Sequence, residues 1–390
     1  MAIYRYFGNN FIGVWVLMSI FVKKILSMNT EILRIIEGGL ANDKRKIISY
    51  SYRLADRLNQ EGDVALASCI RKKLEDSNLR SGIVADALRN VPLDFDSRLQ
   101  IVEVIPPEET IRNIVLAPLT KSQVEEFVNI VLNSSKLEMQ GLDVPKTLIL
   151  YGKPGCGKTS IAHYISYLTG LPLVLARLDS LVSSLLGSTA KNIRKIFDYV
   201  MGFPSILFLD EFDAIAKARD DQKELGELKR VINSLLQNMD AMPKHCVLIA
   251  ATNHPELLDK AVWRRFLQKI EVGMPKSEEL ADLIRLFCGE NQENVANLIL
   301  STKGLINIFE GMSPSDMKNI FDRAKVKAIL SDKKEISISH LLLSAYEMQN
   351  GEKTEDEYIM YLKEKGLTQR SINDLTGISL RKIKSLTANK

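Results

Sequence analysis

The chain has 390 residues, 46% of them hydrophobic and 26% charged, with a formal net charge of +4. Such values are ordinary for a soluble globular protein of two or three domains, and the small charge gives no global argument for nucleic-acid binding. Its four cysteines lie far apart without a CxxC pair. This spacing excludes the usual disulfide and zinc frameworks and indicates reduced thiols, as in a cytoplasmic protein.

The first 27 residues, 1–27, contain an apolar run of twelve, residues 11–22. A membrane-spanning helix needs roughly 20 apolar residues, so this run is short for one. Two interpretations stay open: a leader that associates with a membrane, or a wrongly assigned start. We favour a start at Met28, because the residues that follow read as an ordinary cytosolic beginning with an immediate helix.

Residues 28–76 carry apolar side chains at intervals of three and four, which is the spacing of amphipathic helices. This pattern predicts a helical N-terminal module. Residues 77–110 contain Pro92, Pro106 and Pro107 and are predicted to form a linker.

Residues 111–275 alternate short apolar runs with helical patterns, which predicts an α/β domain with a parallel sheet covered by helices on both faces. Residues 276–350 are predicted to be all-helical, and residues 351–390 to form a small, basic helical tail. The strand candidates are Thr147–Tyr151, Leu171–Ala176, Ser205–Asp210, Cys246–Ala251 and Gln268–Gly273.

The stretch YGKPGCGKTS, Tyr151–Ser160, lies between a predicted strand and a predicted helix and fits the P-loop pattern G-x-x-x-x-G-K-[ST] at each fixed position. In this context backbone N–H groups and the helix N-terminus hold phosphates. Lys158 would reach the β- and γ-phosphates, and Thr159 would bind Mg²⁺. The segment therefore predicts a site for ATP and Mg²⁺. Its candidate residues are Gly152, Pro154, Gly155, Cys156, Gly157, Lys158, Thr159 and Ser160.

Two carboxylates, Asp210 and Glu211, directly follow the apolar run SILFL. Leaving both unpaired at the edge of a sheet would be costly, so a cation is expected beside them. Asp210 is placed to hold Mg²⁺ through water, and Glu211 is placed to polarise the attacking water as a general base. The alternative is a pair of solvated loop acids.

Asn253 follows another apolar run, at the strand end where a parallel sheet places its ligand groups. It could orient water between Glu211 and the γ-phosphate. Arg264 and Arg265 are adjacent within AVWRRF, Ala261–Phe266. They form either a surface ion-pair site or a pair that reaches the γ-phosphate of a neighbouring subunit and stabilises transition-state charge.

These four segments, in this order and at this spacing, resemble the AAA+ ATPases, most closely the branch of FtsH, katanin and spastin. The resemblance covers roughly residues 110–350, in which Gly311–Ala324 is similar to the opening of the family's lid helix. It implies an ATP-driven hexameric ring whose sites are completed by Arg264 and Arg265 of the next protomer. It also implies a protein substrate. Because the sequence has no HExxH or GxSxG pattern, a protease would be a separate partner.

The stretch Ser183–Phe197 resembles the loop with which this family grips its substrate in the pore of the ring. Its candidate residues are Leu185, Leu186 and Gly187, and Leu185 stands where the family usually has an aromatic residue. Leucine offers an apolar grip without the flat face that stacks on an extended peptide. The sequence therefore leaves open whether polypeptide is threaded through the ring.

The last thirty residues contain seven basic and two acidic side chains, a local excess of +5. Thr368 and Ser379 are predicted to cap two short helices that resemble a helix-turn-helix. Arg381, Lys382 and Lys384 would then contact DNA, or the two helices would form a hairpin that docks a protein.

Two functions follow from these motifs. The first is Mg²⁺-dependent ATP hydrolysis by an oligomeric AAA+ ring that remodels or unfolds a protein partner, and Glu211 with the paired arginines favours it. The second is an ATP-driven assembly switch that binds DNA through the basic tail. Stimulation of the ATPase rate by DNA alone, rather than by unfolded protein, would favour the switch.

Overall fold

The computed structural model describes the greater part of the chain in separate ranges. No helix within these ranges is both long and apolar enough to cross a membrane. The apolar run at residues 11–22 and the pore-loop candidate Leu185 lie outside the described residues. The described ranges are 30–40, 44–60, 62–74, 91–94, 98–111, 113–178, 186–214, 225–289, 292–331, 336–350 and 354–387.

The chain divides into two units, and each is described by itself. The first unit contains Met1–Arg112, Glu125–Ile149 and Ala162–Lys269. The second unit contains Asn113–Val124, Leu150–Ile161 and Ile270–Lys390. The glycine loop is thus grouped with the C-terminal helices.

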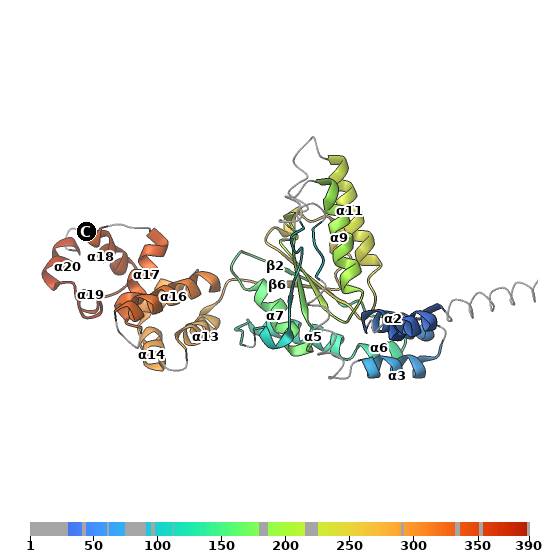
Figure 1. Ribbon diagram of the computed structural model, residues 1–390. Helices are drawn as coiled ribbons and strands as arrows, with labels where there is room; N and C mark the ends of the chain where they lie inside the picture. Colours follow the sequence, from blue (N-terminus) through green and yellow to red (C-terminus); the bar gives the residue numbers. More distant parts are fainter. Residues whose placement is uncertain are drawn as a thin grey trace, which may run out of the picture. The chain divides into compact units, whose positions relative to one another are not determined.

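A six-stranded sheet in the order β1-β3-β4-β5-β2-β6 lies at the centre of the α/β fold (Figure 1). Strand β4 pairs in parallel with β3 and with β5, while β1 pairs antiparallel with β3. The predicted α/β class with a mostly parallel sheet is therefore confirmed, and the five predicted strands correspond to β2 through β6. The strands are β1 (Glu103–Ile105), β2 (Thr147–Tyr151), β3 (Leu173–Arg177), β4 (Ile206–Asp210), β5 (Val247–Thr252) and β6 (Gln268–Glu271).

Strand β1 lies within the region that the prolines predicted to be a linker. It is only 3 residues long, which is too short for an alternating pattern to be read from the sequence. Pairing of Val104 with Val174 of β3 defines it instead. A strand of this kind depends on a partner that is distant in sequence, so local patterns miss it.

The core of the first unit forms between the sheet and helix α9 (Leu186–Val200). Its residues Ile193, Ile196, Phe197 and Val200 follow the spacing of a single helix face, and each is at most 1% exposed. Helix α11 (Leu225–Asp240) lies beside α9 (Figure 1). The strand residues in the same core include Val174, Ala176, Leu207, Leu209, Leu248 and Ala250.

The other helices around the sheet connect its strands or flank them. Short 3-10 helices span Pro107–Glu109 and Pro255–Leu257. The α-helices are α5 (Pro118–Leu132), α6 (Ser134–Met139), α7 (Lys158–Thr169) and α12 (Lys260–Trp263).

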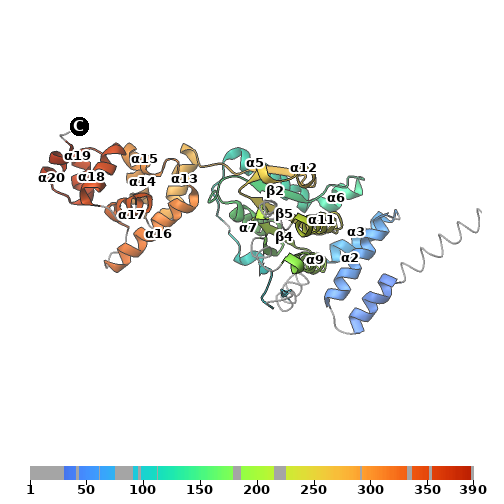
Figure 2. The same cartoon turned by 90° about the horizontal axis from the view of Figure 1, so that it is seen from above.

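In the N-terminal region, two helices follow the helical residues 30–40: α2 (Lys44–Gln60) and α3 (Val64–Leu74). The two helices lie side by side in both views (Figures 1 and 2). The Tyr52 ring of α2 stacks on His245, with ring centroids 4.3 Å apart. Arg71 of α3 forms ion pairs with Asp56, at 2.6 Å, and with Glu138 of α6. We call Tyr52, Arg71, Glu138 and His245 the basal joint.

The regular elements in the described part of the second unit beyond β6 are helices. The C-terminal helices α18, α19 and α20 gather at the end of the chain in both views (Figures 1 and 2). The helices are α13 (Ser277–Cys288), α14 (Glu293–Ser301), α15 (Lys303–Phe309), α16 (Pro314–Leu330), α17 (Ile338–Asn350), α18 (Glu355–Glu364), α19 (Gln369–Thr376) and α20 (Leu380–Thr387).

One hydrophobic core runs through all of these helices. Phe321 of α16 and Leu342 of α17 share it with Leu362, Ile372 and Ile383 from the last three helices. The sequence boundary between residues 350 and 351 therefore does not separate two cores. The tail packs as a continuation of the preceding helical domain.

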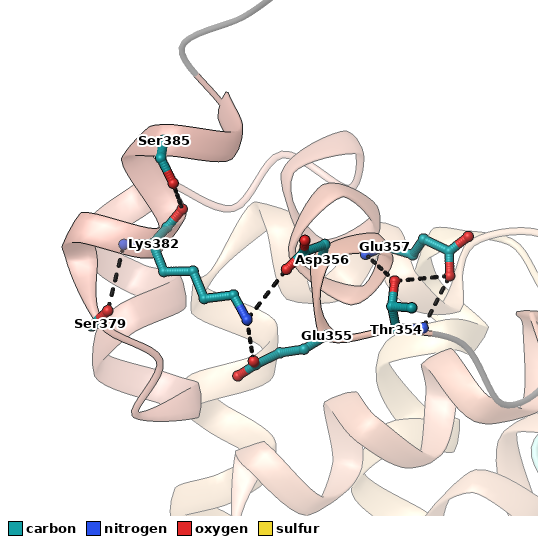
Figure 3. Close-up of polar contacts among 7 residues, drawn as sticks. All are labelled: Thr354, Glu355, Asp356, Glu357, Ser379, Lys382 and Ser385. Atoms are coloured by element: carbon teal, nitrogen blue, oxygen red, sulfur yellow. Dashed lines mark hydrogen bonds and ion pairs between the residues drawn. The ribbon is translucent and has the colours of Figure 1, made fainter.

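An ion-pair cluster joins the last helix to α18 (Figure 3). The Lys382 ammonium lies 3.2 Å from Asp356 and also pairs with Glu355. The predicted caps are confirmed, because Thr368 accepts from the Ser371 N–H at 3.1 Å and Ser379 accepts from the Lys382 N–H at 3.4 Å. Lys382 is thus engaged within the chain.

Candidate functional site

The glycine loop joins β2 to α7 through backbone that only glycine adopts easily. Gly152 has φ 145°, and Gly155 has φ 74°. A Cβ atom on Gly152 would lie 2.2 Å from the Val272 carbonyl oxygen, and one on Gly155 would lie 2.6 Å from Ser313 Oγ. Both glycines are therefore required by sterics, which explains why the sequence gathers residues that pack so little.

Lys158 begins α7 and is nearly buried, with 7% of its surface exposed. Its Nζ donates to the carbonyl oxygens of Gly152 at 2.8 Å and Lys153 at 2.9 Å. The ammonium is thus folded over the loop, at the N-terminal end of α7, whose first turn also contains Thr159 and Ser160. A cation, a glycine cradle and a helix N-terminus together suit a polyphosphate.

The loop is also bonded to the start of α16, the predicted lid helix. The Ser315 N–H donates to the Gly155 carbonyl at 3.1 Å. Ser313 caps this helix, because its Oγ accepts from the Asp316 N–H at 3.2 Å. The loop conformation and the beginning of the lid helix therefore depend on each other.

Cys156 sits inside the loop as a packed side chain. Its Sγ lies 3.4 Å from the Met274 sulfur. Burial raises the pKa of the Cys156 thiol, against the opposite effects of Lys158 and Lys153. A thiol that stays protonated is a poor nucleophile, so its role here is to fill space.

Asp210 and Glu211 terminate β4. The side chain of Asp210 accepts a hydrogen bond from the Glu211 N–H at 2.9 Å. Glu211 is exposed and has φ 53°, a left-handed conformation that costs a non-glycine residue roughly 1 kcal/mol. Such strain persists where surrounding contacts impose it and is frequent at functional sites. The turn presents the Glu211 carboxylate directly after a buried strand.

Asn253 follows β5 and is held by a residue to which no sequence motif assigned a role. Asp213 is 3% exposed and accepts from the Thr252 hydroxyl at 3.0 Å and the Asn253 N–H at 3.2 Å. The only signal in the sequence was the third acid of the run DEFD, just after the buried strand.

Arg264 and Arg265 have different environments. Nε and Nη2 of Arg265 each donate to an oxygen of Asp240 at 2.7 Å, and these bonds lower the pKa of Asp240. Arg265 also donates to the Ala261 carbonyl at 2.8 Å. Arg264 is exposed. Arg265 therefore forms an ion pair with Asp240 of its own chain, whereas Arg264 is exposed to solvent.

The part of the chain that the structure describes contains no group of three or more His, Cys, Asp and Glu side chains suited to a metal ion. A nucleotide-bound Mg²⁺ does not need such a cage, because it takes one or two protein ligands and completes its shell with phosphate oxygens and water. The donor set predicted for it, Thr159 and Asp210, has the required chemistry. Of the pore-loop candidates, Leu186 and Gly187 begin α9.

Comparison with known proteins gives one matching family model, "ATPase family associated with various cellular activities (AAA)", over residues 148–274. An uncharacterized AAA family ATPase, y4kL, of Sinorhizobium fredii is 37% identical over 234 residues, which cover 60% of this chain and 71% of the relative. The proteasome-activating nucleotidase of Methanosarcina mazei is 30% identical over 264 residues, covering 66% of this chain and 59% of the relative.

The ATP-dependent zinc metalloprotease FtsH 2 of Symbiobacterium thermophilum is 29% identical over 229 residues, covering 57% of this chain and 38% of the relative. FtsH and the nucleotidase match at nearly equal identity, so the comparisons support the family and not one branch of it. The matched region 148–274 includes the glycine loop, the two carboxylates, Asn253 and both arginines. The chain belongs to the AAA family of ATPases, and its enzymatic activity is ATP hydrolysis.

Proposed function

We propose that the chain is a Mg²⁺-dependent ATPase that assembles into a ring, with six subunits as in the AAA+ resemblance, and remodels or unfolds a protein partner. The observation that carries this proposal is the glycine cradle: two sterically required glycines, the folded-over Lys158 and a hydrogen bond to the lid helix. Relatives named as an ATP-dependent metalloprotease and a proteasome-activating nucleotidase support a protein substrate and a protease that acts as a separate partner.

Within this proposal each polar group has one role. Lys158 and the loop amides hold the β- and γ-phosphates, and Thr159 and Asp210 hold Mg²⁺, which neutralises charge on the phosphates when bound. Glu211 takes the proton of the attacking water, and Asn253 orients that water. Pro154, Cys156 and Ser160 complete the loop around the phosphates.

The direct test compares the purified chain with Lys158→Ala in phosphate release and nucleotide retention, with Mg²⁺ and ample ATP. Removing the ammonium should abolish both, because no other described side chain replaces it at the loop. Lys153→Ala is the matched control, since Lys153 is an exposed lysine of the same loop, and it should keep wild-type activity. A wild-type chain that neither retains nucleotide nor releases phosphate would overturn the proposal.

We propose Arg264 as the arginine that enters a neighbouring subunit's site, because Arg265 would first have to leave Asp240. The test mixes two inactive variants, Lys158→Ala and Arg264→Ala. In a mixed ring, an intact loop from one subunit meets an intact Arg264 from the other, so activity should return. Mixing that restores no activity would assign Arg264 a role within its own subunit.

A second function, DNA binding through the tail, is favoured by the helix–turn–helix arrangement of α19 and α20 around Gly377, which has φ 77°. Arg381 and Lys384 are exposed, whereas Lys382 pairs with α18. Replacing Arg381 and Lys384 by alanine should weaken DNA binding in a salt-dependent way. Equal binding before and after the change would favour a protein-docking hairpin.

The cysteines also support the proposed cytoplasmic location. All four are free thiols, and three of them are buried. Free cysteines are typical of a reducing compartment. The pore-loop assignment of Leu185, Leu186 and Gly187 stays a prediction.

A further inference from the structure

Asp213 is a buried carboxylate beside the strand ends that bear Glu211 and Asn253. It is 3% exposed. Burying a carboxylate is costly unless hydrogen bonds compensate. The residue must therefore be held by its contacts, and those contacts show what it does.

The contacts of Asp213 tie two segments together. Its Oδ1 accepts from the Thr252 hydroxyl and from the Asn253 N–H. The Thr252 hydroxyl oxygen in turn accepts from the His254 N–H at 3.0 Å. One side chain from the β4 turn thus helps to fix the last residue of β5, Thr252, and the two residues that follow it.

The pairing of β4 with β5 does not reach Glu211 or Asn253. The parallel register of β4 and β5 ends at the pair Leu209 and Ala250. Glu211 and Asn253 both lie beyond it. One further backbone bond, from the Phe212 N–H to the Ala251 carbonyl at 2.8 Å, crosses between the segments. The Asp213 bonds continue this connection as far as Asn253.

The strained turn at Glu211 needs such support. A left-handed φ of 53° in a non-glycine residue persists when the surrounding structure imposes it. The Ala214 N–H closes the turn by donating to the Glu211 carbonyl at 2.9 Å. Asp213 lies inside this turn, so its bonds to the β5 segment also hold the turn in place.

We propose that Asp213 is a positioning residue: it fixes Asn253 relative to the turn that carries Glu211, so that both side chains address one water molecule. The inference rests on the proposed function of Glu211 and Asn253 in ATP hydrolysis. Asp213 does not touch the nucleotide in this scheme. Its loss displaces Asn253 and slows turnover, while the phosphate-binding loop is left unchanged.

The first experiment measures kcat and KM for ATP, together with the melting temperature, for the full chain and its Asp213→Ala variant. A misplacement of about 1 Å near the reacting atoms can cost about a hundredfold in rate, so kcat should fall about tenfold to a hundredfold. KM should stay within about twofold, because the glycine loop binds the phosphates. Asp198→Ala is the control, an exposed acid of α9, and should match wild type.

Conservative variants separate positioning from folding. Asp213→Asn keeps an acceptor oxygen for both donors and should recover most of kcat. Thr252→Ser keeps the hydroxyl and should be nearly wild type, whereas Thr252→Val removes it and should lower kcat. These three variants carry the test if Asp213→Ala fails to fold. Equal kcat values for Thr252→Ser and Thr252→Val would overturn the proposal, whatever the kcat of Asp213→Asn.

A double-mutant cycle tests whether Asp213 acts through Asn253. In an Asn253→Ala background, Asp213→Ala should cause little further loss of kcat. Losses that multiply would show that Asp213 acts independently and would overturn the inference. Failure of the proposed function looks different: the wild-type chain would not hydrolyse ATP, or Asn253→Ala alone would leave kcat unchanged.

Discussion

The two ends of strand β5 are both rich in buried polar contacts, but they are built differently. Before the strand, His245 stacks on Tyr52 beside Arg71, which pairs with Asp56 and Glu138. At the end of the strand, Asp213 holds its last residue, Thr252, and the next residue, Asn253. At the basal joint the single positive charge of Arg71 is shared between the carboxylates of Asp56 and Glu138. At the other end the bonds hold backbone and leave the Glu211 carboxylate exposed.

The basal joint also contains a cavity of about 100 Å³, lined in part by Tyr52, Arg71, Lys146 and His245. Both of its lysines are used within the chain, because Lys146 Nζ donates to the Lys244 carbonyl at 2.6 Å and the Lys244 ammonium pairs with Asp143. A cavity with polar walls is therefore insufficient to identify a site. The strained backbone and the exposed acid distinguish the other end of β5.

The largest expected effect is that of Glu211→Gln. Loss of the general base should lower the rate of phosphate release about a hundredfold to ten-thousandfold while ATP stays bound, which stabilises the oligomer. Phosphate release, nucleotide retention and sedimentation check this. Glu256→Gln, at an exposed acid after β5, should behave as wild type. A Glu211→Gln variant with normal turnover would show that Glu211 is not the general base. The two ends of β5 would then no longer differ in catalytic role.

Arg71→Met tests whether the basal joint is structural. The change leaves the carboxylates of Asp56 and Glu138 without their cation, so the free energy of unfolding should fall by about 3 kcal/mol. Chemical denaturation measures it. Arg53→Met, at an exposed position of α2, should change stability by less than about 0.5 kcal/mol. The kcat of folded Arg71→Met should equal wild type, and a loss of kcat would show that the two ends are coupled.

His245 should make stability depend on pH. Burial lowers the pKa of His245 from its ordinary 6.5 to about 3. Below pH 6.5 the unfolded chain takes up a proton that the folded chain refuses until about pH 3. Stability is therefore fully present above pH 6.5 and falls as the pH drops, by at most about 1.4 kcal/mol per pH unit.

His245→Phe keeps a ring against Tyr52 and should flatten this slope in denaturation curves recorded between pH 4 and 7, roughly the window in which histidine titrates. An unchanged slope in His245→Phe would show that other titratable groups dominate the pH dependence of stability. The basal joint would then not be a source of that dependence.

The signals in the sequence from which the site is predicted are local. The glycine loop, the acids after β4 and the Asn253 position each lie within a few residues of an apolar run that reads as a strand. Gly152 and Gly155 carry a steric requirement in their own backbone. The confirmed caps at Thr368 and Ser379 are equally local.

The features that the sequence analysis did not predict depend on partners that are distant in the chain. Strand β1 exists through β3, and Asp213 is satisfied by Thr252. The adjacent residues Arg264 and Arg265 do not themselves indicate which arginine forms an ion pair within the chain, because its partner, Asp240, is distant in the sequence.

The sequence by itself thus determined five of the six strands of the sheet, β2 to β6, and indicated a phosphate loop and acids beside it, because periodicity and glycine sterics act over neighbouring residues. Only the tertiary structure decided that the tail shares its core with the preceding helices, that Lys382 is paired with α18, and that Asp213 joins the ends of two strands. Each of these depends on the burial of groups brought together by folding, and burial is a property of the whole packed chain.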